Sequence, residues 1–207
     1  MGTRLGSGLA HLATDGTARG RADEAERVTL HPLLAQRWSP TAFDESHQAS
    51  DHEVDTLLEA ARWAPSAGNS QPWAFVVGRR GDDIHDRLLR HLAVSSARWA
   101  PRASILVANL ALRYIEDTDW EYSEFSLYDL GQAVAHMTIQ AQALGLATHQ
   151  FRAFDRAALA TELGVPGHWE VSTMAAIGRA AEQAPSAASG RVRRSPTEVR
   201  WQPAPPA

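Results

Sequence analysis

The sequence predicts an α+β fold in one domain, on three observations. Short apolar runs suited to strands alternate with stretches whose apolar residues recur at helical spacing, a pattern typical of helices layered on a sheet. The 207 residues are 44% hydrophobic and 21% charged, enough for one sizeable core. Neither a repeat nor an interior linker divides the chain, so we expect a single domain.

The first half contains a well-marked helix and a strand that follows it. Ser50 and Glu53 have capping-box spacing, the apolar residues behind them recur at helical spacing, and Pro65 ends the pattern. Residues 73–77 then predict a short strand, and residues 84–92 predict a weaker helix.

The second half repeats this alternation. Residues 103–112 form an apolar run suited to a buried strand. Residues 124–144 predict the longest helix, whose apolar face holds Leu127, Leu130, Val134, Met137 and Ala141. A strand at 146–151, a helix capped by Asp155 and a strand at 169–177 follow.

The two ends look different from the interior. Residues 1–27 are rich in Gly, Ala, Arg and Asp and predict a disordered tail, whereas 28–201 form the predicted domain. Within it, residues 191–201 suit an extended arm, and 202–207 are a loose Pro-rich tail. The beginning lacks the apolar core of a secretory signal, no run could span a bilayer, and we expect a cytoplasmic protein.

Composition excludes several classes of chemistry. The chain has no cysteine, and all 20 basic residues are arginine, so thiolate and lysine Schiff-base chemistry are absent. The formal net charge of -4 gives no general attraction to nucleic acid or anionic membranes. The nine histidines are scattered without metal-ligand spacing, so we predict no metal. An enzyme of this composition would place its hard chemistry on an organic cofactor.

The segment 65–73, Pro-Ser-Ala-Gly-Asn-Ser-Gln-Pro-Trp, is the most informative part of the chain. It lies between a predicted helix and a predicted strand, where binding loops are common. Its prolines stiffen both ends, Gly68 allows a close backbone approach, and its hydroxyls and amides can donate and accept hydrogen bonds. Such a loop could form hydrogen bonds with the edge of a flat heteroaromatic ring. Alternatively, its side chains could only cap its own backbone.

Residues 61–73 resemble the signature loop of the FMN-dependent nitroreductase family, and three further segments strengthen the resemblance. Residues 37–44 are similar to the family's opening Arg-x-Ser motif, 143–155 to its second flavin segment, and 191–199 to its basic cluster before the C-terminal arm. The resemblance covers about residues 31–201. It implies a nitroreductase-like three-layer α/β sandwich, with a central mostly antiparallel sheet and a C-terminal arm exchanged in a homodimer.

The resemblance also implies a cofactor site without side-chain acids or bases. The backbone N–H of Ala153 would lie near flavin N5, and the candidate contacts are Arg37, Trp38, Ser39, Thr41, Pro65, Ser66, Ala67, Asn69, Gln71, Arg98, Arg152, Ala153, Arg191, Arg193 and Arg194. Arginine suits the FMN phosphate because its planar fork binds two oxygens at once. Each arginine could instead be an ordinary surface cation.

Two positions depart from the family pattern. Thr41 stands where the family usually has Arg or Lys near the flavin N1 edge, so this chain lacks the usual cation there. Ala153 stands where the family commonly has Gly, but the backbone N–H remains. The aromatic side chains of Trp120, Tyr122, Phe125 and Tyr128 could line the substrate side, although their spacing favours core packing.

The resemblance implies an FMN oxidoreductase in which NAD(P)H delivers hydride to flavin N5 and a nitroaromatic, quinone or similar acceptor is reduced in a ping-pong cycle. A flavin-binding storage or sequestering protein with little turnover is the alternative, motivated by Thr41. A structural dimer without flavin is a third possibility. Neither the physiological acceptor nor the choice between NADH and NADPH follows from the sequence.

Overall fold

The computed structural model describes residues 30–182 and 191–204. The expected disordered tail at 1–27 and the last three residues lie outside these ranges, and the domain limits remain a prediction. Four strands form one sheet in the order β1-β2-β4-β3. They are β1 (Trp73–Arg79), β2 (Ile105–Leu112), β3 (Ala147–Phe151) and β4 (Trp169–Gly178), and every neighbouring pair is antiparallel.

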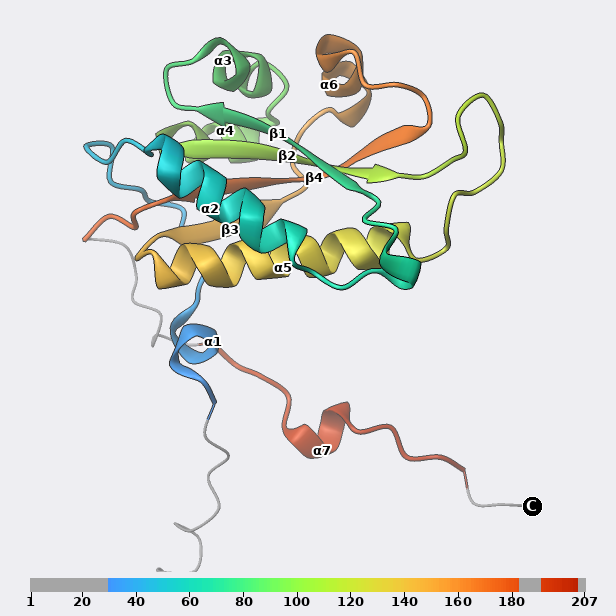
Figure 1. Ribbon diagram of the computed structural model, residues 1–207. Helices are drawn as coiled ribbons and strands as arrows, with labels where there is room; N and C mark the ends of the chain where they lie inside the picture. The colour runs from blue at the N-terminus through green and yellow to red at the C-terminus, as the bar shows by residue number, and fades with distance from the viewer. Residues whose placement is uncertain (1–29, 183–190, 205–207) are drawn as a thin grey trace, which may run out of the picture. The chain divides into compact units, whose positions relative to one another are not determined.

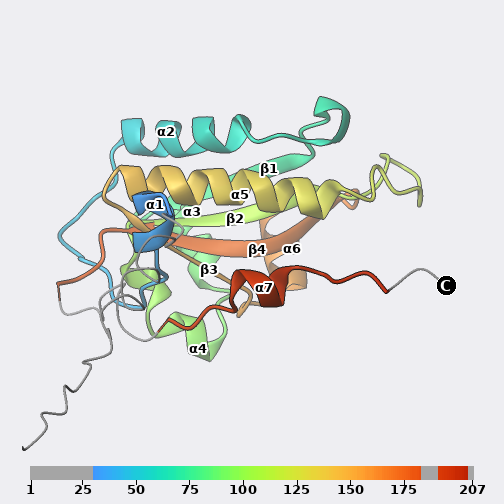
Figure 2. The same cartoon turned by 90° about the horizontal axis from the view of Figure 1, so that it is seen from below.

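Helices cover both faces of this sheet (Figures 1 and 2). The helices are α1 (Pro32–Gln36), α2 (Asp51–Arg62), α3 (Asp83–Leu89), α4 (Val94–Ala97), α5 (Ser126–Ala143), α6 (Arg156–Leu163) and α7 (Pro196–Val199). One hydrophobic cluster joins α2 and α5 to one face through Leu57, Met137 and Ile177. The other joins α3 and α6 to the opposite face through Leu88 and Leu159. The α+β class and the three-layer arrangement are therefore confirmed.

Local sequence signals account for several element boundaries. Ser50 and Glu53 form the expected capping box at the start of α2. The Asp155 carboxylate accepts the Ala158 N–H at 3.0 Å and begins α6. Gly164 ends that helix with φ 66°, a left-handed conformation that glycine adopts without steric cost.

Three sequence predictions were wrong. The arm at 191–201 is not extended throughout, because a Ser195–Glu198 capping box starts the single turn of α7. Leu127 is 41% exposed and does not join the buried face of α5. The four aromatic side chains ahead of and within α5 are exposed rather than core, at 75%, 39%, 47% and 67% for Trp120, Tyr122, Phe125 and Tyr128.

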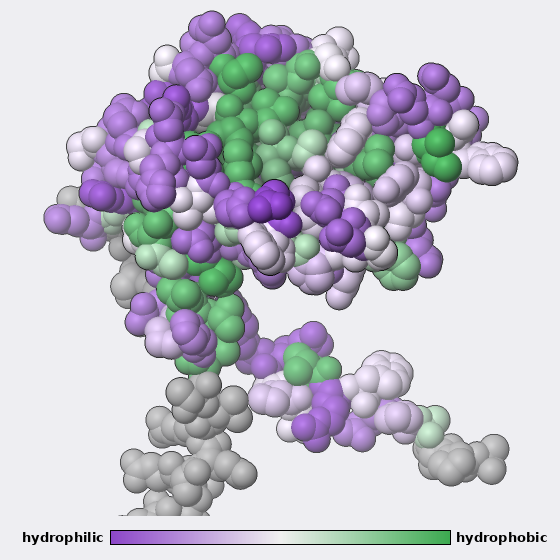
Figure 3. Space-filling model, in the orientation of Figure 1, coloured by the Kyte–Doolittle hydropathy of each residue, from purple (hydrophilic) through white to green (hydrophobic). Residues whose placement is uncertain are grey.

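The apolar side chains of β1 gather on the surface between α2 and α3 (Figure 3). Residues 73–77 of this strand are only half-buried, and within the described ranges β1 pairs with β2 alone. A sheet edge of this kind presents main-chain groups and apolar side chains that another segment can cover.

Gly78→Ala should destabilise the fold by about 1–3 kcal/mol or more, the usual cost of overpacking. A Cβ at Gly78 would lie 2.5 Å from the backbone nitrogen of His85 and 2.6 Å from the Cα of His85. These are backbone atoms, which cannot rotate away as a side chain could. Urea unfolding should show the loss. Gly131→Ala is the matched control, because a Cβ there meets nothing within 4 Å and alanine favours α5. Equal stability of the two variants would contradict this account.

Candidate functional site

The segment 37–41 is held against β3. The Pro40 carbonyl lies 2.9 Å from His149 Nδ1 on that strand. Ser39 and Thr41 on either side of Pro40 are exposed, whereas Pro40 is buried and Trp38 half-buried. The hydroxyls of Ser39 and Thr41 can therefore face a ligand while the backbone between them stays anchored.

The second flavin segment lies in the same region. The Ala153 carbonyl accepts the Ala93 N–H at 3.0 Å and the Ser96 hydroxyl, which ties the segment to the start of α4. Trp99, just after α4, stacks on His149 with ring centroids 4.3 Å apart. The Ala153 backbone is thus bonded to the start of α4, and β3, which precedes it, contacts both Trp99 and the 37–41 segment through His149.

Two candidate arginines flank this region. Arg98 is exposed and directly precedes Trp99. The Arg152 guanidinium lies 5.5 Å from the centre of the Phe154 ring. Burial lowers the pKa of Arg152, the Arg156 charge lowers it further, and Glu170 opposes the shift. Arg152 remains a cation at neutral pH because guanidinium pKa values begin far above 7.

The C-terminal segment adds positive charge beside Arg37. The Arg191 guanidinium donates to the Ala35 carbonyl at 2.7 Å and to the Arg37 carbonyl. Burial lowers the pKa of Arg37, and the charges of Arg191 and Arg193 lower it further. Such mutual repulsion is relieved when an anion binds. Arg194 is exposed just before α7. The structure thus brings Arg37, Arg191 and Arg193 together into one basic group.

The loop at 65–72 has a strained, internally bonded backbone. Gly68, Asn69 and Gln71 have φ values of 58°, 56° and 50°, a region that only glycine enters easily. The Ser66 hydroxyl accepts the Gln71 N–H at 3.0 Å. The Gln71 side-chain amide donates to Asn69 Oδ1 at 3.3 Å, so these two exposed side chains act as a pair. Strain of this kind persists where the surroundings hold it.

A buried carboxylate on α5 holds this loop in place. Asp129 is 2% exposed, and its Oδ2 accepts the Ala67 N–H at 3.0 Å. The Ala67 amide is therefore committed to the protein and not free for a cofactor. Gln132, one turn further along α5, approaches the Pro65 carbonyl at 3.5 Å. The first turns of α5 thus anchor the loop.

The candidate residues form two separate groups within one chain. The 65–72 loop leads into Trp73, which pairs with Ala111 at one end of the sheet. The 37–44 segment meets the opposite end, where Phe43 bridges Ala180 just beyond β4. Figures 1 and 2 show that the loop lies beside the start of α5, whereas β3 lies near the end of this helix. The 18 residues of α5 correspond to about 27 Å. Arg37 and the loop therefore cannot contact one small ligand within a single chain.

Sequence reasoning missed three residues that hold the site. Asp129 carried a usable signal, since it is an acid on the helix face that also holds Leu130 and Val134. His149 and Ser96 carried none, because their partners are main-chain carbonyls more than fifty residues away in sequence.

The described residues offer neither a metal site nor a membrane-spanning helix. Residues 30–182 and 191–204 contain no group of His, Asp or Glu side chains arranged to hold a metal ion. None of the helices in these ranges combines the length and apolar character that a bilayer crossing requires.

Known proteins resemble this chain in sequence and in fold. The sequence profile of the Nitroreductase family matches residues 34–98. An NADH dehydrogenase of Thermus thermophilus is 30% identical over 156 residues, covering 61% of this chain and 75% of the relative. An oxygen-insensitive NADPH nitroreductase of Helicobacter pylori is 30% identical over 114 residues, covering 55% of this chain and 53% of the relative.

A solved structure agrees with these relatives. The crystal structure of an oxidoreductase containing FMN superposes with a TM-score of 0.70 at 28% identity, covering 76% of this chain and 80% of that one. The chain belongs to the nitroreductase family.

Proposed function

We propose that this protein is an FMN-dependent NAD(P)H oxidoreductase that reduces nitroaromatic, quinone or similar acceptors. The convergence of Arg37, Arg191 and Arg193 carries the proposal, because it places a basic group beside the polar backbone of residues 39–41. FMN, whose phosphate is a dianion, matches such a group. The match to an FMN-containing oxidoreductase and to NADH- and NADPH-dependent relatives supports the assignment.

The residues present fit the two ends of FMN. Arg37, Arg191 and Arg193 would hold the phosphate, and the Asn69–Gln71 pair would offer donors and acceptors to the edge of the ring. The Ala153 N–H would face the reactive edge, on a segment whose carbonyl is already tied to Ala93 and Ser96.

Bound FMN would supply the redox chemistry, taking hydride from NAD(P)H and passing the electrons to the acceptor in a second half-reaction. The protein itself would bind and orient. Arginine charge would fix the phosphate, the rigid 65–72 loop would set the plane of the ring, and no side-chain acid or base is required.

We further propose a homodimer in which each flavin site uses two chains. The 65–72 loop would come from one chain and the Arg37 group from the other, because within one chain they lie at opposite ends of the sheet. The arm at 191–201 would stay anchored beside Arg37 through Arg191 and would cross to the partner beyond Arg193, since Val199 and Trp201 are 59% and 88% exposed and the half-buried edge of β1 offers an apolar surface. The cytoplasmic location expected from the sequence stays a prediction.

Purification tests the assignment directly. The protein should be yellow, and the cofactor released by heating should run as FMN rather than FAD on chromatography. Stopped-flow mixing with NADH and with NADPH should bleach the flavin, and an acceptor screen should restore its colour. A colourless protein that also refuses added FMN would overturn the proposal, whereas a yellow protein that neither nicotinamide bleaches would favour the storage alternative.

Thr41→Arg should raise the reduction potential of the bound flavin. Thr41 is exposed beside the anchored Pro40, so an arginine there can extend without repacking the core. A positive charge stabilises the anionic reduced flavin more than the neutral oxidised one. Redox titration in one buffer measures the shift, which should shrink in high salt.

The matched control is Thr41→Gln, which adds length without charge and should leave the potential near that of the parent. An unchanged potential in Thr41→Arg, with FMN still bound, would mean that another cation already serves this edge.

A further inference from the structure

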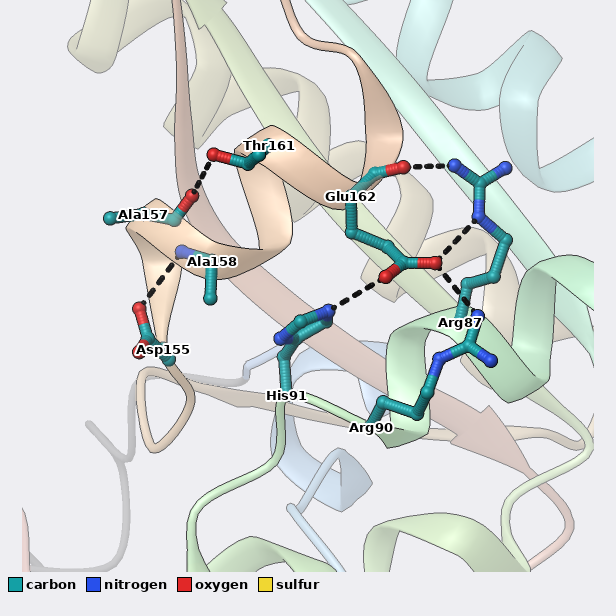
Figure 4. Close-up of polar contacts among 8 residues, drawn as sticks. All are labelled: Arg87, Arg90, His91, Asp155, Ala157, Ala158, Thr161 and Glu162. Atoms are coloured by element: carbon teal, nitrogen blue, oxygen red, sulfur yellow. Dashed lines mark hydrogen bonds and ion pairs between the residues drawn. The ribbon is translucent and has the colours of Figure 1, made fainter.

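A carboxylate on α6 contacts three cationic or protonatable side chains from α3 and from the two residues that follow it (Figure 4). The Glu162 Oε1 lies 2.7 Å from Arg90 Nη2 and 3.3 Å from Arg87 Nε. Its second oxygen lies 3.5 Å from His91 Nε2. The Arg87 guanidinium also donates to the main-chain carbonyl of Glu162. We call these four residues the Glu162 clamp.

Glu162 keeps its negative charge at neutral pH. The Glu162 side chain is 29% exposed, and this partial burial alone would raise its pKa. The hydrogen bond and charge of Arg90, followed by the hydrogen bonds of Arg87 and His91, outweigh burial and bring the pKa of Glu162 below its usual value. A carboxylate shared by two guanidinium groups is an ordered junction rather than a single mobile surface pair.

The residues directly after α3 carry the main chain of the second flavin segment. The His91 carbonyl accepts the Asp155 N–H at 2.9 Å, and the Ala93 N–H donates to the Ala153 carbonyl at 3.0 Å. Leu92 forms an isolated antiparallel bridge with Phe154 between these two bonds. His91 therefore contacts the clamp through its ring and the flavin segment through its backbone.

We propose that Glu162 is a positioning residue, which fixes His91–Ala93 through the clamp and thereby fixes the Ala153 amide on the segment paired with it. This inference rests on the proposed function, in which that amide faces the flavin. Glu162 itself lies on α6 and need not touch the cofactor. Glu162 would act through the backbone, because the order of residues 153–155 depends on the order of residues 91–93, to which they are bonded.

Amide hydrogen exchange in the full-length chain tests the positioning step without any cofactor. Glu162→Gln should speed exchange of the Ala93 and Asp155 amides, which bond the two segments together, by about tenfold, while amides in the middle of α6 change little. If the amides of α6 exchange faster by the same factor, Glu162 has a merely structural role and the proposal is overturned. Exchange rates equal to those of the parent would also overturn it.

Flavin kinetics test the consequence. With FMN added, Glu162→Gln should slow flavin reduction at saturating NADH by about tenfold, because a misplaced group costs rate more than binding. The NADH concentration that gives half the maximal reduction rate should change less than about twofold, and so should the affinity for FMN. Loss of FMN affinity with an unchanged reduction rate would overturn the proposal.

Control variants separate the clamp from charge removal in general. Glu45→Gln removes an exposed partner of Arg102, whose Nε lies 3.4 Å away, and should match the parent in both measurements. Arg90→Lys keeps a cation at the clamp and should also stay close to the parent. If Glu162→Gln folds poorly, His91→Asn removes the ring that contacts Glu162 and should give the same local exchange pattern.

The two proposals can fail separately. A parent chain that refuses FMN would overturn the proposed function, while the exchange measurement would still show whether Glu162 orders residues 153–155. If the parent binds and reduces FMN, and Glu162→Gln has the same amide exchange and the same rate of flavin reduction as the parent, the proposed function stands and only the positioning role is overturned.

Discussion

Mixing two variants that each bind FMN poorly should restore tight binding. Arg37→Ala should weaken FMN binding by about 1.5–3 kcal/mol, because a charge-assisted bond to phosphate is lost. Asn69→Ala and Gln71→Ala should each cost about 1–3 kcal/mol, with a non-additive total because the two side chains bond to one another.

Recovery follows from a site shared between two chains. A heterodimer of Arg37→Ala with the Asn69→Ala/Gln71→Ala double variant has one site with both defects and one with none. Equal mixing with free exchange of chains makes about half of the dimers mixed, so about a quarter of all sites should bind FMN at parental affinity. Flavin absorbance after co-refolding or co-expression measures this fraction.

Each variant refolded alone is the control and should remain weak. Mass spectrometry must show that mixed dimers have formed. Mixed dimers without recovered binding would place both groups in one chain's site and contradict the shared arrangement. Unfolding curves of both variants are compared with that of the parent, because Asn69 and Gln71 have positive φ values, at which alanine costs stability, and binding is measured where both variants remain folded.

Asp129→Ala should loosen the 65–72 loop and lower the free energy of unfolding. Asp129 is 2% exposed and accepts the Ala67 N–H at 3.0 Å, so its removal leaves a part-buried donor without its partner. The expected loss is about 1–3 kcal/mol. The affinity for FMN should fall as well, because Asn69 and Gln71 depend on the left-handed backbone that this anchor supports.

Urea unfolding and flavin titration measure the two effects. Asp129→Asn keeps the shape and one oxygen and should fall between the alanine variant and the parent. Asp119→Ala removes an exposed acid outside the helices and strands and serves as the neutral control. Parental stability together with parental FMN affinity in Asp129→Ala would show that the loop keeps its conformation without the carboxylate.

Elements defined by local interactions were predicted close to their true limits. The Ser50–Glu53 capping box starts α2, and Gly164 ends α6 in the left-handed conformation. The apolar run at 103–112 became β2, buried along nearly its whole length. In each case the deciding contacts lie within a few residues of one another, so the sequence contains them explicitly.

Predictions that depended on distant neighbours fared less well. The aromatic side chains from Trp120 to Tyr128 have the spacing of a packed face, but no element of the described chain covers them. Periodicity states which residues share a face and not whether another surface meets that face. The short α1 and α4 were not anticipated, since each is about one turn long and shows no clear period.

The sequence by itself determined the layered α+β fold, the family and the chemical character of the candidate site residues. Those features depend on local patterning and on residue types, both of which the sequence states directly. Only the tertiary structure decided that Arg37 and Arg191 come together, that Asp129 anchors the loop, and that this loop lies at the other end of the sheet. Strand order and register set these distances, and they are fixed by packing between segments far apart in the chain.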